Sequence, residues 1–125
     1  MIAYLKGIVL SVGTESVVLD VSGVGYEALC SQNTLAKLEA QTPAALFAYT
    51  HVREDALQIY GFETIHEKEL FLSLLKVNGV GPKLAIKILS ATSVENFLNW
   101  IESSDVGALS KIPKVGKKTA EQLVL

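Results

Sequence analysis

The stretch that decides the fold is Lys76-Val77-Asn78-Gly79-Val80-Gly81-Pro82-Lys83-Leu84-Ala85. The residues before it, from about 65 to 77, have apolar side chains at helical intervals and open with Thr64-Ile65-His66-Glu67, which has the spacing of a capping box. After the glycines, Pro82 suits the first position of a helix, where its missing N–H costs nothing. The stretch therefore predicts a helix, a tight turn and a second helix.

Such a turn has two interpretations. Most glycine-containing connections between helices are only tight turns. A glycine turn that leads into a helix N-terminus also exposes backbone N–H groups at the positive end of the helix dipole, where a phosphate can bind. The second interpretation predicts phosphate contacts at the turn and at the adjacent lysine, namely at Asn78, Gly79, Val80, Gly81 and Lys83.

The same pattern returns further along the chain as Lys111-Ile112-Pro113-Lys114-Val115-Gly116-Lys117-Lys118-Thr119-Ala120. The repeat favours phosphate binding, because two such turns can hold two phosphate backbones or two places on one duplex. The second turn has Lys114 where the first has Gly79, and a non-glycine residue at positive φ costs on the order of 1 kcal/mol. Either this turn relaxes and binds less tightly, or the lysine charge offsets the poorer backbone geometry. The predicted contacts here are Lys114, Gly116, Lys117, Lys118 and Thr119.

The first half of the chain is typical of β structure. Turn residues such as Gly13-Thr14 and Ser22-Gly23 separate short apolar or β-branched runs. The predicted strands cover residues 8–10, 16–21, 26–29, 44–49 and 57–60, with a short helix over 32–38 and a turn or bulge at Gly23 and Gly25. Five short strands in about sixty residues predict a small closed barrel, for which the OB-fold is the usual solution. Periodicity alone does not distinguish it from another small barrel.

The second half continues with helical patterns. A helix over 82–91 is followed by Thr92-Ser93-Val94-Glu95, which again has capping-box spacing, and Asp105 is a candidate N-cap for a short helix before the second turn. The predicted organisation is a β-barrel domain over residues 1–62 and a helical domain over 63–125.

Composition limits the function classes. The chain has 125 residues and a net charge of −2, but residues 1–65 hold three Lys/Arg and seven Asp/Glu, whereas 66–125 hold eight and six. No apolar run is long enough to cross a bilayer and no signal peptide is evident, so a soluble cytoplasmic protein is expected. Cys30 is the only cysteine, and His51 and His66 lack ligand spacing. No metal site, cofactor site or catalytic cluster is therefore predicted.

Four further segments, together with the paired turns, resemble the RuvA family of bacterial Holliday-junction recognition proteins. They are Met1-Ile2-Ala3-Tyr4-Leu5-Lys6-Gly7, Gly23-Val24-Gly25-Tyr26-Glu27, Val52-Arg53-Glu54-Asp55-Ala56 and Tyr60-Gly61-Phe62. The resemblance covers essentially the whole chain and identifies the turns as tandem helix-hairpin-helix motifs behind an OB-fold barrel. It also implies a fourfold homotetramer, with one or two tetramers on each junction, and it implies a glycine where this chain has Lys114.

The resemblance gives a role to Glu54 and Asp55. By itself an acidic pair between two strands is a solvated hairpin tip, whereas in the family the matching pair forms an acidic pin where the junction strands cross. The family also implies partners: RuvB hydrolyses ATP and moves the strands, RuvC cleaves them, and a third domain beyond a linker contacts RuvB. That third domain is not expected within these 125 residues.

The predicted function is sequence-independent binding of four-way DNA junctions for RuvB-driven branch migration in recombination and repair, without catalysis by this chain. Two alternatives stay open. One is a helix-hairpin-helix DNA-repair enzyme, which would need a catalytic cluster that the sequence does not offer. The other is a protein-interaction scaffold, which salt-sensitive DNA binding would exclude as the sole role.

Overall fold

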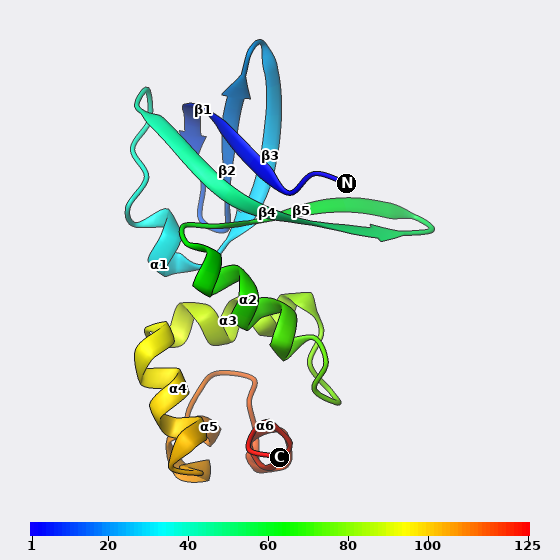
Figure 1. Ribbon diagram of the computed structural model, residues 1–125, viewed down its shortest axis with the longest axis vertical. Helices are drawn as coiled ribbons and strands as arrows, with labels where there is room; N and C mark the ends of the chain where they lie inside the picture. Colours follow the sequence, from blue (N-terminus) through cyan, green and yellow to red (C-terminus); the bar gives the residue numbers. More distant parts are fainter. The chain divides into compact units, whose positions relative to one another are not determined.

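The N-terminal strands pair into a closed barrel, as the five short apolar or β-branched runs predict. The computed structural model describes residues 1–125 (Figure 1). The strands are β1 Tyr4–Val12, β2 Ser16–Val21, β3 Val24–Cys30, β4 Pro43–Arg53 and β5 Ala56–Phe62. They close in the order β1-β2-β3-β5-β4, around a core that includes Leu5, Val9, Val17, Leu19, Ala28, Leu46 and Ile59. The predicted class, a five-stranded OB-like barrel followed by a helical domain, is confirmed.

The barrel consists of an antiparallel meander, β1-β2-β3, and an antiparallel hairpin, β4-β5, joined by two seams. One seam is the antiparallel pairing of β1 with β4, from Tyr4 opposite Phe47 to Ile8 opposite Pro43. The other is parallel and short, because β3 pairs with β5 only over residues 28–30 and 59–61. Only the second seam breaks the antiparallel pattern of the barrel.

The glycines at the start of β3 agree only in part with the prediction. Gly23 has φ of 94° and makes the turn between β2 and β3, as expected. Gly25 marks no bulge, because it lies opposite Asp20 in a continuous ladder. The irregularity lies instead in β1, between Val9 and Ser11.

The short helix α1 spans Gln32–Leu35 and ends three residues before the predicted end. The chain tightens after it, since Lys37 N–H donates to the Thr34 carbonyl and Leu38 N–H to the Leu35 carbonyl, each three residues back. Ser31 is the N-cap, and its hydroxyl accepts from Thr34 N–H at 3.2 Å.

The predicted capping box at Thr64 is half right, and its other half is replaced by long-range bonds. Glu67 N–H donates to Thr64 Oγ1 at 3.1 Å, as in a capping box. The Glu67 carboxylate, which is only 6% exposed, instead accepts from Ser31 Oγ at 2.9 Å, Thr34 Oγ1 at 2.7 Å and Glu63 N at 3.2 Å. The residue that the local sequence pattern marks as part of a capping box therefore forms buried hydrogen bonds that connect α1 with the start of the next helix.

The remaining helices are α2 Ile65–Leu74, α3 Pro82–Ala91, α4 Val94–Glu102, α5 Val106–Ser110 and α6 Lys117–Leu123. α2 ends at Leu74 instead of residue 77, because Lys76 and Val77 donate to carbonyls three residues back. The N-cap of α4 is Ser93, not Thr92, and its hydroxyl accepts from Asn96 N–H at 3.1 Å. Asp105 caps α5 as predicted, accepting from Ala108 N–H at 3.0 Å.

The chain divides into two compact units, Met1–Lys68 and Glu69–Leu125, so the division falls inside α2. The predicted domain boundary after residue 62 stays a prediction. No helix has both the length and the apolar character that crossing a bilayer requires.

Candidate nucleic-acid interface

The two repeated turns have the same backbone conformation. Gly79 has φ of 86° and Lys114, at the equivalent position, has φ of 71°. Gly81 has φ of −102° and ψ of −178°, and Gly116 has φ of −89° and ψ of −178°. The second turn has therefore not relaxed away from the glycine geometry, although Lys114 has a side chain.

A buried valine holds each turn against its own helices. Val80 is 6% exposed and Val115 is 3% exposed. Their N–H groups donate to the carbonyls of Val77, at 3.1 Å, and Ile112, at 2.9 Å. Val80 was predicted to contact phosphate, but its side chain is buried and its N–H is already bonded, so it shapes the turn and offers no donor.

The glycines after the valines are the N-caps of α3 and α6, and neither has a side chain to cap its helix. Ala85 N–H donates to the Gly81 carbonyl, and Ala120 N–H donates to the Gly116 carbonyl, each at 2.9 Å. The N–H groups ahead of these two alanines have no acceptor in the structure, as expected for the first turn of a helix. They belong to Gly81, Lys83 and Leu84 in the first motif and to Gly116, Lys117, Lys118 and Thr119 in the second.

The fold itself does not require glycine at these two N-caps. A Cβ added at Gly81 or at Gly116 would meet no atom within 4 Å, and both residues have a φ that any residue adopts. Gly79 is different, because its positive φ favours glycine. The open space beside Gly81 and Gly116 is therefore available to a group from another molecule.

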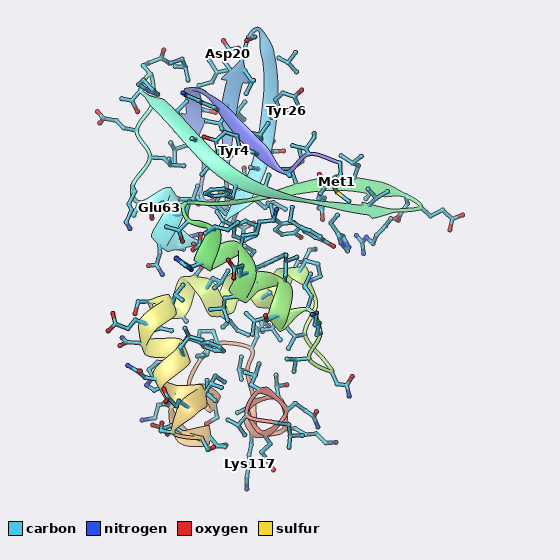
Figure 2. The ribbon with its side chains drawn as sticks, in the orientation of Figure 1. Met1, Tyr4, Asp20, Tyr26, Glu63 and Lys117 are labelled. Atoms are coloured by element: carbon cyan, nitrogen blue, oxygen red, sulfur yellow. The ribbon has the colours of Figure 1, made fainter.

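Exposed lysines surround both turns. They are Lys76, Lys83 and Lys87 at the first turn and Lys111, Lys114, Lys117 and Lys118 at the second. None of them is in an ion pair, since the salt bridge of this chain joins Lys37 to Glu63 at 2.7 Å. Figure 2 shows the Lys117 side chain extending outward from α6. Unpaired cations beside free N–H groups suit an anionic ligand.

The acidic pair lies at the tip of the β4-β5 hairpin. Arg53 is opposite Ala56, so Glu54 and Asp55 form a two-residue turn, and both are exposed. Figure 1 shows the hairpin continuing past the other strands of the barrel to this tip. Two carboxylates without a cationic partner thus occupy the tip of this hairpin.

The other titratable candidates do not form a reactive site. Burial, together with the nearby negative charge of Glu67, raises the pKa of the Cys30 thiol to about 12. That thiol is buried and stays protonated, so it is a poor nucleophile. No group of three His, Cys, Asp or Glu residues is placed to hold a metal ion.

Sequence patterns located the turn residues and the acidic tip, but they missed the buried carboxylate of Glu67. Its only sequence signal was the capping-box spacing, which does not reveal bonds to Ser31 and Thr34. Sequence patterns also missed two polar residues beside the acidic tip, His51 and Gln58, which are paired across the hairpin.

Comparison with known proteins accounts for nearly the whole chain. A family model described as RuvA N terminal domain matches residues 1–61, and one described as SAM-like helix-hairpin-helix tandem matches residues 71–125. Three relatives named Holliday junction branch migration complex subunit RuvA are similar over the full chain. The protein from Bdellovibrio bacteriovorus is 54% identical over 127 residues, that from Acinetobacter baumannii 48% over 125, and that from Symbiobacterium thermophilum 46% over 126. This chain spans 65%, 63% and 62% of their respective lengths.

Proposed function

We propose, because this chain belongs to the RuvA family, that it binds four-way DNA junctions by their shape and contributes to branch migration in recombination and repair. The observation that carries the proposal is the duplicated turn. Two turns of equal geometry present free N–H groups, unpaired lysines and a glycine that the fold does not need. A phosphate oxygen that approaches these N–H groups closely would explain why glycine stands there.

Contacts of this kind carry no base information. Backbone N–H groups and lysines bind phosphate oxygens, which are the same for every sequence. We therefore assign phosphate contacts to Gly81 and Lys83 in the first motif and to Lys114, Gly116, Lys117, Lys118 and Thr119 in the second. Asn78 and Gly79, exposed at the first apex, complete the proposed surface.

Specificity for junctions then has to come from elsewhere, and we assign it to the acidic tip. Carboxylates close to phosphates repel them, so Glu54 and Asp55 would keep continuous duplex away and would help to separate strands at a crossover. The double variant Glu54→Gln, Asp55→Asn should bind junctions at least as well and should discriminate less against linear duplex. Unchanged discrimination would refute this role.

We further propose the assembly that the family implies. Four copies would place four acidic tips around one axis, and one or two such tetramers would hold a junction open. The chain would act without catalysis of its own, beside RuvB as the ATP-hydrolysing motor and RuvC as the nuclease. Because the relatives that this chain resembles come from bacteria and the proposed substrate is DNA, we place the protein in the cytoplasm.

The test is a competition gel-shift at two salt concentrations, with a four-way junction and a linear duplex of equal length and arm sequence. We expect a strong preference for the junction, independent of arm sequence, and weaker binding at higher salt because phosphate contacts release counterions. Equal affinity for junction and duplex would refute junction recognition. Binding that does not change with salt would refute the phosphate contacts.

A further inference from the structure

The β4-β5 hairpin has two chemically different faces. Residues alternate along each strand, and Tyr49 pairs with Tyr60 while His51 pairs with Gln58, so these side chains and Arg53 lie on one face. The opposite face near the tip carries Val52 and Leu57 instead, also directly paired. Exposure on the polar face increases toward the tip, from 2% at Tyr60, through the half-buried His51 and Gln58, to the exposed Arg53. We call Arg53, His51 and Gln58 the hairpin flank.

Two tyrosines fix what the flank offers to a ligand. The Tyr60 hydroxyl donates to Gln58 Oε1 at 3.3 Å, which leaves the Gln58 amide N–H groups free. The Tyr49 hydroxyl lies 3.2 Å from His51 Nδ1, so Nε2 is the ring nitrogen left for a ligand. The imidazole also lies 5.9 Å from the Tyr49 ring and 6.5 Å from the Tyr60 ring, measured between centroids.

Arg53 adds a full positive charge to this face. Arg53 lies on the same face of the hairpin as Tyr60. Burial raises the pKa of Tyr60, and the positive charge of Arg53 partly opposes that effect. Arg53 makes no ion pair with the neighbouring acidic residues. The flank therefore holds a guanidinium, an amide donor and an imidazole, and its one amide oxygen is already bonded.

We propose that the hairpin flank binds a backbone phosphate of a junction strand beside the crossover, so that the hairpin repels DNA at its tip and holds it at its side. This inference rests on the proposed function and adds a binding site to it. A guanidinium with neighbouring N–H donors is suited to a phosphate, which is anionic and has only acceptors.

Attraction at the flank is compatible with repulsion at the tip because the two forces differ in range. A charge-assisted hydrogen bond needs contact at about 2.7–2.9 Å. Repulsion by Glu54 and Asp55 acts over roughly 8–10 Å at moderate salt. A strand bound at the flank would therefore be held beside the tip and prevented from lying across it.

The experiment uses the full chain with Arg53→Gln and His51→Phe variants, measured for binding to a four-way junction and to linear duplex. His51→Phe keeps a ring against the two tyrosines and removes only the nitrogens. The matched control is Lys6→Gln, which also removes one exposed charge from the barrel. Lys6 pairs with Ala45, eight residues before Arg53 on β4, or roughly 26 Å along the strand.

We expect Arg53→Gln to weaken junction binding about tenfold or more, because a hydrogen bond to a charged group contributes about 1.5–3 kcal/mol. His51→Phe should weaken it severalfold, and both variants should leave duplex affinity and melting temperature unchanged. Arg53→Lys should retain the salt dependence of the wild type and lose part of its affinity, since lysine keeps the charge without the planar fork.

Two outcomes would overturn the inference. In one, both flank variants bind the junction as the wild type does. In the other, they weaken junction and duplex equally and to the same extent as Lys6→Gln, which would indicate a general charge effect. A wild type without junction preference would instead overturn the proposed function, so the two failures are distinguishable.

Discussion

Replacing Gly81 by alanine separates folding from DNA binding. The added Cβ would meet nothing within 4 Å, and the φ of −102° is accessible to alanine. Two small effects on stability oppose each other. Alanine restricts the unfolded chain and so stabilises by about 0.4–1 kcal/mol, whereas alanine is a poorer N-cap than glycine by a similar amount. The net change should lie within about 0.5 kcal/mol, or roughly 2 °C in melting temperature.

The effect on DNA should be much larger. A methyl group at Gly81 would occupy the space that a phosphate needs in order to reach the free N–H groups of Gly81, Lys83 and Leu84. Loss of one hydrogen bond to a charged group costs about 1.5–3 kcal/mol, which corresponds to roughly 10- to 150-fold in affinity for each contact. We expect Gly116→Ala to behave in the same way at the second turn.

The assay combines a gel-shift with a four-way junction and a thermal melt of the same preparation. Two glycines serve as controls. Gly107→Ala, inside α5, meets only an ordinary contact at 3.5 Å and should leave binding unchanged. Gly61→Ala would place its Cβ 3.0–3.1 Å from Leu46, Ala28 and Cys30, so it should lower the melting temperature while the folded protein still binds. Wild-type affinity in Gly81→Ala would refute the phosphate contact, and a large drop in its melting temperature would refute the geometry.

Three further predictions concern other residues. Lys114→Gly should leave the free energy of unfolding equal or up to about 1 kcal/mol higher, because it relieves a φ of 71°. The same variant should bind the junction less tightly, and the slope of log affinity against log salt concentration should fall by about one for the lost phosphate contact. Higher affinity would show that the lysine hinders binding. Thr34→Val should destabilise the protein by about 1.5–3 kcal/mol in thermal melts, because the Glu67 carboxylate loses a buried hydrogen-bond donor at 2.7 Å. The control is Thr42→Val, which removes an exposed hydroxyl and should change stability by less than about 0.5 kcal/mol. The pKa of Cys30 is raised from 9.0 to about 12, so the stability that the protonated thiol contributes is complete below pH 9 and is lost as the pH rises toward 12. The wild type should therefore lose more stability than Cys30→Ala between pH 8 and 11. Equal losses would contradict this prediction.

Sequence periodicity predicted the elements well where a local pattern determines them. The bounds of β2 and α3 match the expectation, because turn residues delimit the first and Pro82 begins the second. The end of α2 and the N-cap of α4 were wrong by one to three residues, since competing caps and tight last turns depend on small energy differences.

The candidate site was predictable as far as the repeat extends. The spacing showed that Lys114 stands where Gly79 does, but only the backbone shows that both have positive φ. Whether a Cβ would fit at Gly81 and Gly116 depends on which atoms surround these residues in the folded protein, and no local sequence pattern encodes those surroundings. The same applies to His51 and Gln58, which become neighbours only through the register of β4 with β5.

The short parallel seam between β3 and β5 also has a consequence for how the barrel folds. The meander and the hairpin each need only local contacts, whereas both seams join distant parts of the chain; the seam between β3 and β5 is the weaker of the two, because it holds over three residue pairs and the seam between β1 and β4 over five. Long-range pairings form slowly, because closing a long loop costs entropy before any contact is gained. We therefore expect ring closure at this seam to limit the folding rate of the barrel. In hydrogen exchange, amides bonded across it should open ahead of those between β1 and β2, which makes the seam the first point at which the ring comes apart.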